Sequence, residues 1–336
     1  MGLFWSMNPV PGVSLKPLLR QADVTTPLVF RLSVMNDHIP FADLQLPSSV
    51  VLATGELQRW YKHETVRRVE VREGSLRGTL FLPAGKGPFP GVLDMFGSTG
   101  GLVEFRAALL ASRGFVSFAL AYFRYDDLPS SLADVDFDYF LDAVDWLSSH
   151  PSVHGEGIGV VGGSKGGELA FLLGMATDKV KVLVNISGLP VYSFEDVKKS
   201  GEIYWKGVSV DITKLKHTDE GFYTRDAVPY DSEVIPAWKN NAQILYLVGD
   251  DDGLWKTDHA NTFMESCPKE KRKTIELVSY PGTGHLIEPP YMPVNRAQYH
   301  PLLGKTVVMG GHHQAHAAAQ EDAWRRILNI LQKHIS

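Results

Sequence analysis

A serine enclosed by glycines constrains the fold of this chain more than any other feature. The pentapeptide GGSKG, residues 162–166, follows a short apolar run at 158–161 and precedes a helix-like stretch at 168–176. A sharp turn from a strand into a helix leaves little room for side chains beside its central residue, which accounts for the glycines. We therefore predict a strained strand–turn–helix unit, with the Ser164 hydroxyl at the carboxyl end of a sheet.

Strand-like and helix-like stretches alternate from about residue 67 to the carboxyl terminus. A hairpin pattern at 69–82 comes first, and the helix predicted at 136–149 has apolar residues at every third or fourth position. Buried strands are predicted at residues 88–95, 115–121, 158–161, 181–187, 244–248 and 275–280, and a closing helix at 314–331. Alternation of this kind is typical of a parallel sheet covered by helices, so we expect an α/β fold.

The beginning of the chain follows a different pattern. Two β-rich segments at 26–35 and 49–61 flank a loop-like stretch at 36–47. The chain has 336 residues, 44% of them hydrophobic, which suffices for one large domain and a smaller piece. We expect a small β domain at residues 1–65 and an α/β domain at residues 66–336.

The composition argues against several classes of protein. The formal net charge of -5 carries no polyanion-binding pattern, so nucleic acid is not an expected partner. The single cysteine, Cys267, excludes an internal disulfide framework and favours a reducing compartment. No apolar stretch approaches the roughly 20 residues that span a bilayer, and no signal-peptide pattern is evident. We expect a cytoplasmic monomer without a membrane span, with the peroxisome and the mitochondrion as alternative compartments.

Three histidines near the carboxyl terminus have a spacing compatible with metal binding. They are His312, His313 and His316. No cysteine or carboxylate cluster accompanies them, so we interpret them as the start of a helix and expect no metal site.

Two later strands end beside residues that could activate Ser164. A serine hydroxyl is a weak nucleophile until a base removes its proton and an acid orients that base, in the chain order serine, acid, histidine for this kind of turn. The strand at 244–248 leads into three aspartates, residues 250–252, and the strand at 275–280 leads into His285. Ligands bind at the carboxyl ends of strands in open α/β sheets, so we expect these groups to lie close together.

Seven short strings carry a family resemblance. They are RGTLFLP at 77–83, GPFPG at 87–91, DMFG at 94–97, AYF at 121–123, SKGGEL at 164–169, WK at 255–256 and GHLIEPPY at 284–291. Together the strings resemble the family of acyl-CoA thioesterases and bile acid-CoA:amino acid N-acyltransferases. The resemblance implies an α/β-hydrolase fold, fatty acyl-CoA as the substrate, and neither a cofactor nor a metal.

The resemblance also implies a role for each residue around the serine. Ser164 is the nucleophile, Asp252 the orienting acid and His285 the base. Asp252 is preferred over the two aspartates before it because it stands three residues before Trp255, as the acid of the family stands before its tryptophan.

Attack by the serine creates an oxyanion that needs two hydrogen-bond donors. One expected donor is the backbone N–H of Lys165, the residue after the nucleophile. The other is a backbone N–H of the glycine-rich loop at 96–101, with Gly97 and Ser98 as the candidates. We interpret the Lys165 side chain as an exposed lysine at a helix start rather than as a contact for an anionic group of coenzyme A.

The identity of the nucleophile separates two activities of the family. Members with cysteine at this position tend to transfer the acyl group to an amino acid, whereas serine accompanies hydrolysis. Ser164 therefore predicts a thioesterase, with N-acyl transfer and a truncated, non-catalytic isoform as the alternatives.

The amino-terminal part departs from the family. Members carry a complete β-sandwich before the hydrolase domain, and an immunoglobulin-like sandwich needs roughly 100 residues. Only about 65 precede the expected boundary, so we predict a partial β-sandwich with unpaired strand edges and some risk of aggregation.

Overall fold

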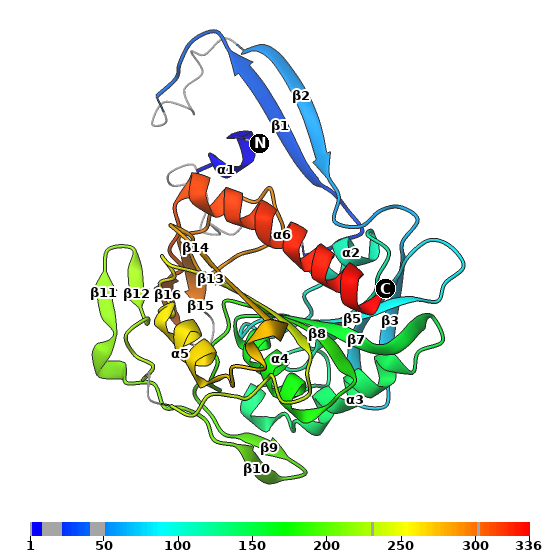
Figure 1. Cartoon of the computed structure of the whole chain (residues 1–336). Coiled ribbons are helices and arrows are strands. Elements are labelled where there is room, and N and C mark those ends of the chain that lie inside the picture. The colour runs from blue at the N-terminus through cyan, green and yellow to red at the C-terminus, as the bar shows by residue number, and fades with distance from the viewer. Residues whose placement is uncertain (1, 9–21, 41–50, 230–231, 301–302) are drawn as a thin grey trace.

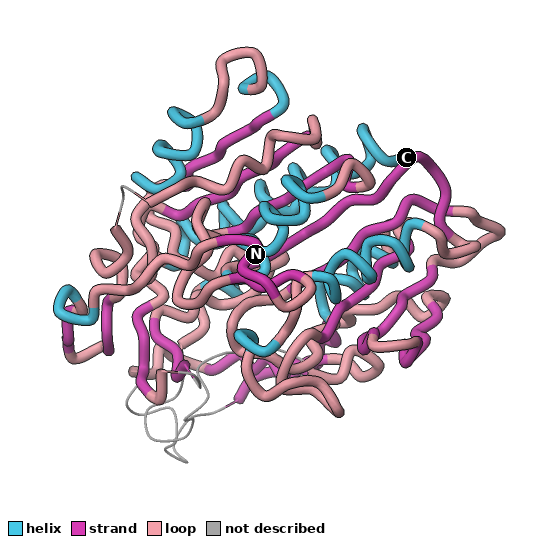
Figure 2. Tube along the Cα trace, turned by 90° about the horizontal axis from the view of Figure 1, so that it is seen from below, coloured by secondary structure: helices cyan, strands magenta, loops and turns pink. Residues whose placement is uncertain are grey.

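An eight-stranded sheet with helices on both faces dominates the structure (Figures 1 and 2). This computed structural model describes residues 2–8, 22–40, 51–229, 232–300 and 303–336. Among them, no helix is both long and apolar enough to cross a membrane. The expected α/β fold is confirmed.

The strands of the central sheet lie in the order β14-β13-β8-β7-β5-β6-β4-β3. Their bounds are β3 (Arg67–Glu73), β4 (Leu76–Leu82), β5 (Phe89–Met95), β6 (Val116–Ala121), β7 (Val153–Gly163), β8 (Val180–Ile186), β13 (Gln243–Gly249) and β14 (Ile275–Tyr280). The hairpin strands β3 and β4 are antiparallel to each other and β4 is antiparallel to β6, whereas the six strands from β6 to β14 run parallel. Every strand predicted for this region is present. The largest difference is the early start of β7, where Gly155 and Gly157 interrupt the apolar pattern.

Two helical layers cover the sheet. The helices α3 (Asp138–Ser148), α4 (Lys165–Ala176) and α5 (Asp258–Ser266) cover one face, and α2 (Phe105–Ala111) and α6 (His313–Ile335) cover the other. Successive strand residues point to opposite faces, so Leu93 and Tyr246 pack with the first layer while Val92 and Leu245 pack with the second. The parallel strands are buried on both faces, which explains their continuous apolar runs.

A second, smaller sheet was not predicted from the sequence. It has the order β11-β12-β16-β15, and a separate pair joins β9 to β10. The bounds are β9 (Val197–Lys199), β10 (Glu202–Trp205), β11 (Lys216–Thr218), β12 (Gly221–Tyr223), β15 (Ala297–His300) and β16 (Lys305–Val308), with 3-10 turns at Leu132–Asp134, Ile212–Lys214 and Arg272–Thr274. Strands of three or four residues are too short to show a periodic pattern. Val307 of β16 is buried in one apolar cluster with Leu254 and Trp255, which follow the carboxyl end of β13.

The amino-terminal region contributes one short helix and one antiparallel strand pair. These are α1 (Gly2–Trp5), β1 (Leu28–Met35) and β2 (Val51–Arg59), and the strand pair extends away from the rest of the molecule (Figure 1). Within the described residues, no third strand joins β1 and β2 and neither strand has a buried residue. Part of the predicted loop and the first residues of the second β segment, 41–50, lie outside the described residues. The chain rejoins the main core at Tyr61, which packs edge-on against Phe105.

Candidate active site

Ser164 occupies the predicted strained turn between β7 and α4. Its backbone has φ 53° and ψ -123°, a conformation that costs a residue with a side chain on the order of 1 to 3 kcal/mol. Gly162 and Gly166 are required sterically. A Cβ on Gly162 would lie 2.0 Å from the carbonyl oxygen of Gly166, and one on Gly166 would lie 2.4 Å from that of Phe96.

Asp252 and His285 meet beyond the ends of neighbouring strands. Asp252 follows β13 and His285 follows β14, and the Nδ1 of His285 lies 2.8 Å from the Oδ2 of Asp252. Both residues are buried. The other carboxylate oxygen accepts hydrogen bonds from the backbone N–H groups of Leu254 (2.7 Å) and Trp255 (3.1 Å), which fixes the carboxylate. An Nδ1–H that donates to Asp252 leaves the Nε2 of His285 with a free lone pair.

The three consecutive aspartates have different partners. Asp250 accepts a hydrogen bond from the N–H of Gly282 at 2.5 Å, and Asp251 accepts one from the N–H of Gly311 at 2.8 Å. Both therefore stabilise backbone turns near the site. Of the three, Asp252 is the one whose carboxylate contacts the imidazole.

Ser164 and His285 line a common cavity of about 60 Å³. Its walls are largely apolar and include Phe105, Ile186 and Ile287. No direct hydrogen bond joins the two catalytic candidates in this structure. Such contacts are often long in free enzymes and shorten when substrate binds, so the arrangement is compatible with proton transfer.

The loop after β5 passes directly beside Ser164. A Cβ on Gly97 would lie 3.2 Å from the Cβ of Ser164 and 3.6 Å from its Oγ. Tyr122 donates hydrogen bonds to the carbonyls of Phe96 and Gly97, the latter at 3.0 Å. Among the described residues, no group accepts a hydrogen bond from the N–H of Gly97 or Ser98. These N–H groups and that of the first helical residue of α4 are available to an anion.

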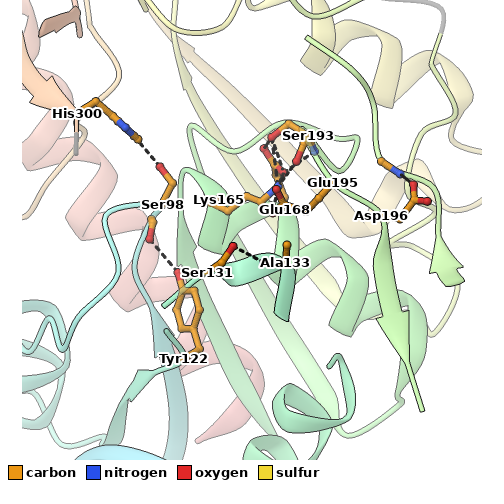
Figure 3. A network of polar contacts seen from close by, with 12 residues as sticks. Ser98, Tyr122, Ser131, Ala133, Lys165, Glu168, Ser193, Glu195, Asp196 and His300 are labelled. Carbon is orange, nitrogen blue, oxygen red and sulfur yellow. Dashed lines mark hydrogen bonds and ion pairs between the residues drawn. The ribbon is translucent and has the colours of Figure 1, made fainter. Parts of the chain in front are cut away.

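The prediction of an exposed Lys165 side chain is wrong. This side chain is buried; its Nζ lies 3.0 Å from a carboxylate oxygen of Glu168 and donates to the carbonyl of Ser193 (Figure 3). The Nζ also lies 3.4 Å from the centre of the Tyr192 ring. Glu168 also accepts from the N–H of Ser193 at 2.9 Å. The segment after β8 covers the start of α4, and Glu168 supplies the opposite charge that burial of a lysine requires.

A second cavity of about 290 Å³ adjoins Ser164. Its lining includes Trp255, Phe194 and the partly buried Glu195, whose pKa is raised by burial. The two cavities share four lining residues, which are Ser98, Ser164, Leu254 and His300. Ser164 therefore stands where two hollow regions meet.

His300 is a site residue that the sequence did not indicate. It ends β15 in the unpredicted sheet and lies with its Nε2 2.9 Å from the Oγ of Ser98. No motif surrounds it, and the short strand gave no periodic signal.

The carboxyl-terminal histidines begin a helix, as predicted. His313 is the first residue of α6, and His316 lies beside the loop that carries His285. The two ring nitrogens of His316 contact the N–H of Gly284 (3.2 Å) and the carbonyl of Leu286 (2.7 Å). His316 therefore positions the backbone on both sides of His285. In the described part of the chain, no three His, Cys, Asp or Glu side chains form a group that could hold a metal ion.

The fold and the geometry around Ser164 define an α/β hydrolase. Among solved structures, a putative dienelactone hydrolase from Klebsiella pneumoniae subsp. pneumoniae has a TM-score of 0.52 at 17% identity, over 80% of this chain and 98% of that chain. At this identity the likeness shows the fold alone.

Two family models match the chain. The one for the acyl-CoA thioester hydrolase/BAAT N-terminal region matches residues 1–73, and the one for the BAAT/acyl-CoA thioester hydrolase C-terminal region matches residues 135–336. The chain belongs to this acyl-CoA thioester hydrolase/BAAT family, as the sequence strings predicted.

Two relatives represent the activities named in the family. Human acyl-coenzyme A thioesterase 1 is 39% identical over 350 residues, which cover 100% of this chain and 79% of the relative. Mouse bile acid-CoA:amino acid N-acyltransferase is 38% identical over 341 residues, which cover 100% of this chain and 80% of the relative.

Proposed function

We propose that the protein hydrolyses fatty acyl-CoA thioesters to a free fatty acid and coenzyme A, with Ser164, Asp252 and His285 as its catalytic residues. The observation that carries the proposal is the 2.8 Å contact between Asp252 and His285, beside a cavity that also contains the strained Ser164. The substrate class rests on the thioesterase and acyltransferase relatives, whose names share an acyl-CoA donor.

Acylation begins when the Nε2 of His285 removes the hydroxyl proton of Ser164. The serine oxygen then bonds to the thioester carbonyl carbon, and the carbonyl electron pair moves to oxygen. When this oxyanion collapses, the carbon–sulfur bond breaks and the leaving thiolate takes the proton from His285, so that coenzyme A departs as a thiol. Asp252 stays ionised and stabilises the transient imidazolium.

Deacylation repeats the same steps with water. His285 removes a proton from the water, the water oxygen attacks the ester carbon, and the bond to the Ser164 oxygen breaks as that oxygen regains its proton. In both halves of the reaction, the backbone N–H groups of Lys165 and of Gly97 or Ser98 stabilise the oxyanion. Loss of one such donor typically raises the barrier by about 2.7 to 4 kcal/mol.

Transfer to an amino acid is the second candidate, because one relative is named for that reaction. An acceptor such as glycine or taurine carries a negatively charged group, and a basic side chain without an acidic partner in the cavity would help to bind it. The two basic side chains among the described cavity linings are already paired, Lys165 with Glu168 and Arg106 with Asp94. Together with a serine nucleophile, this pairing favours water as the acceptor.

Release of free thiol from acyl-CoA of several chain lengths tests the proposal. We expect turnover by the native chain and none by Ser164→Ala, while Ser148→Ala keeps the native rate because its hydroxyl bonds within α3. Mass analysis with glycine or taurine present separates fatty acid from conjugate. A native chain that releases no thiol from any acyl-CoA would overturn the proposal and favour the non-catalytic alternative.

The domain boundary, the oligomeric state and the compartment are also proposed. We place the domain boundary near residue 65, in agreement with an amino-terminal family match that ends at residue 73. We also expect a monomer, and the cytoplasm as its compartment.

A further inference from the structure

A second histidine faces the candidate site from the small sheet. His300 lies at the end of β15, is 9% exposed and contacts the hydroxyl of Ser98 at 2.9 Å (Figure 3). Both residues line both cavities beside Ser164. In the proposed reaction Ser98 contributes only its backbone N–H, and His300 has no role.

The surroundings of His300 define the direction of this hydrogen bond. Burial lowers the pKa of His300, and the nearby His285 lowers it further, so the ring is neutral near pH 7. The Nδ1 of His300 is buried and has no hydrogen-bond partner among the described residues. A buried N–H without an acceptor is rarer in proteins than an acceptor without a donor, so the proton belongs on Nε2. His300 therefore donates to the Ser98 oxygen.

A hydroxyl that accepts from His300 keeps its own hydrogen for another acceptor. Within the described residues, Ser98 has no other hydrogen-bond partner. Ser98 and Ser164 line the same two cavities, so the Ser98 hydroxyl borders the space in which the thioester carbonyl must lie during attack.

We infer that the Ser98 hydroxyl, held by His300, donates a hydrogen bond to the oxyanion that forms when Ser164 attacks its substrate. This inference rests on the proposed function and adds a side-chain donor to the backbone donors. Ser98 is then a catalytic residue. His300 is a positioning residue because it acts through Ser98 and does not touch the reacting atoms.

The first test replaces the hydroxyl. A hydrogen bond made to a charged group contributes most when the charge develops, so Ser98→Ala should lower kcat about 10- to 100-fold and leave KM unchanged. The matched control Ser148→Ala should keep both constants. Equal kcat values for Ser98→Ala and the native chain would overturn the inference.

The second test separates a positioning role from a structural one. His300→Gln keeps an N–H donor near the position of the imidazole Nε2 and should retain most of kcat, whereas His300→Leu should approach the loss seen in Ser98→Ala. In a Ser98→Ala background, His300→Leu should cause no further loss, because its effect passes through the hydroxyl. Additive losses, or equal losses in the Gln and Leu variants, would overturn the role of His300.

A third measurement keeps this inference separable from the choice of substrate. Acylation of Ser164 by p-nitrophenyl butyrate passes through the same kind of oxyanion. Its rate can be followed by mass spectrometry of the acylated protein. If p-nitrophenyl butyrate acylates the native chain but the chain does not hydrolyse acyl-CoA, the proposed function fails. Slower acylation of Ser98→Ala would then still support the Ser98 hydroxyl as a donor to the oxyanion. Equal acylation rates, or no acylation of the native chain, would overturn the inference.

Discussion

Three consecutive aspartates after β13 have different hydrogen-bond partners. Asp250, Asp251 and Asp252 follow one strand, yet two of them accept from backbone N–H groups of other turns and one faces His285. The difference arises from the direction in which each side chain leaves a tight turn. It allows the role of one carboxylate to be measured against two matched neighbours.

We expect Asp252→Asn to lower kcat on the order of 10⁴-fold, because an amide neither holds the same imidazole tautomer nor stabilises the imidazolium. Asp250→Asn and Asp251→Asn should affect stability more than kcat. Steady-state thiol release and thermal unfolding of the three variants check this. A loss of kcat in Asp251→Asn as large as that in Asp252→Asn would contradict the assignment of the acid.

A buried histidine away from the site makes stability depend on pH. Burial lowers the pKa of His259 on α5 from its ordinary value of 6.5 to about 4. Above pH 6.5 neither the folded nor the unfolded chain binds this proton, and the contribution of neutral His259 is fully present. As the pH falls toward 4 the unfolded chain binds the proton first, so the free energy of unfolding decreases by up to about 3 kcal/mol.

Urea unfolding between pH 7 and pH 4 checks this prediction. We expect His259→Gln to flatten the decrease without removing it, since burial also lowers the pKa of His300 and His316. A variant whose unfolding free energy falls as steeply as that of the native chain would show that His259 is not the group responsible.

At the scale of elements, the end of β2 supports the loop that follows His285. Arg59 lies over the ring of Tyr61 at 4.7 Å and donates to the carbonyls of Pro290 (2.8 Å) and Tyr291. The preceding loop residues line the cavity that contains Ser164. Arg59 of the amino-terminal region therefore contacts the loop that follows His285, although it has no part in the proposed chemistry.

We predict that Arg59→Met destabilises the protein by about 1 to 3 kcal/mol and lowers kcat/KM, because two carbonyls lose their donor and the loop loses its support. Arg31→Met is the control, since Arg31 is exposed on the same strand pair and lies 3.8 Å from Glu56, a kind of contact worth about 1 kcal/mol or less. The free energy of unfolding in denaturant and the kcat/KM of both variants check this prediction. Equal effects in the two variants would contradict a specific role for Arg59.

At the scale of the whole molecule, the sequence predicted those parts whose signal is local. Apolar runs gave the strands of the central sheet, and parallel strands bring their carboxyl ends to one edge, so the proximity of Asp252 and His285 followed from their positions after β13 and β14. The bounds of β7 were less predictable because glycines interrupt its apolar pattern.

The remaining features depend on segments that meet only in three dimensions. Lys165 is buried by a loop some 28 residues later in the chain, and only its spacing of three from Glu168 could have indicated an ion pair. His300 reaches the site through a sheet whose strands are too short to leave a pattern. Local sequence carries no information about contacts between segments that lie far apart in the chain.

Both strands of the amino-terminal pair expose large apolar side chains. Val34 is 59% exposed and Leu52 is 64% exposed, and within the described residues neither β1 nor β2 has a second strand partner. Unpaired edges with apolar side chains favour pairing between copies. The prediction of a partial β-sandwich stays a prediction, and self-association is the property that tests its unpaired edges.

We expect the native chain to show concentration-dependent self-association in sedimentation velocity, beyond the monomer that we predict at low concentration. The double variant Val34→Lys with Leu52→Lys should reduce this association because charged side chains on an edge oppose pairing between strands. It should keep the native kcat because neither residue lines the two cavities beside Ser164. The matched control places two lysines at Ile203 and Ile212, which are also exposed, and so changes the net charge equally. If the control reduces association as much as the test variant, net charge rather than the strand pair is responsible, and a native chain that stays monodisperse at high concentration would contradict the prediction.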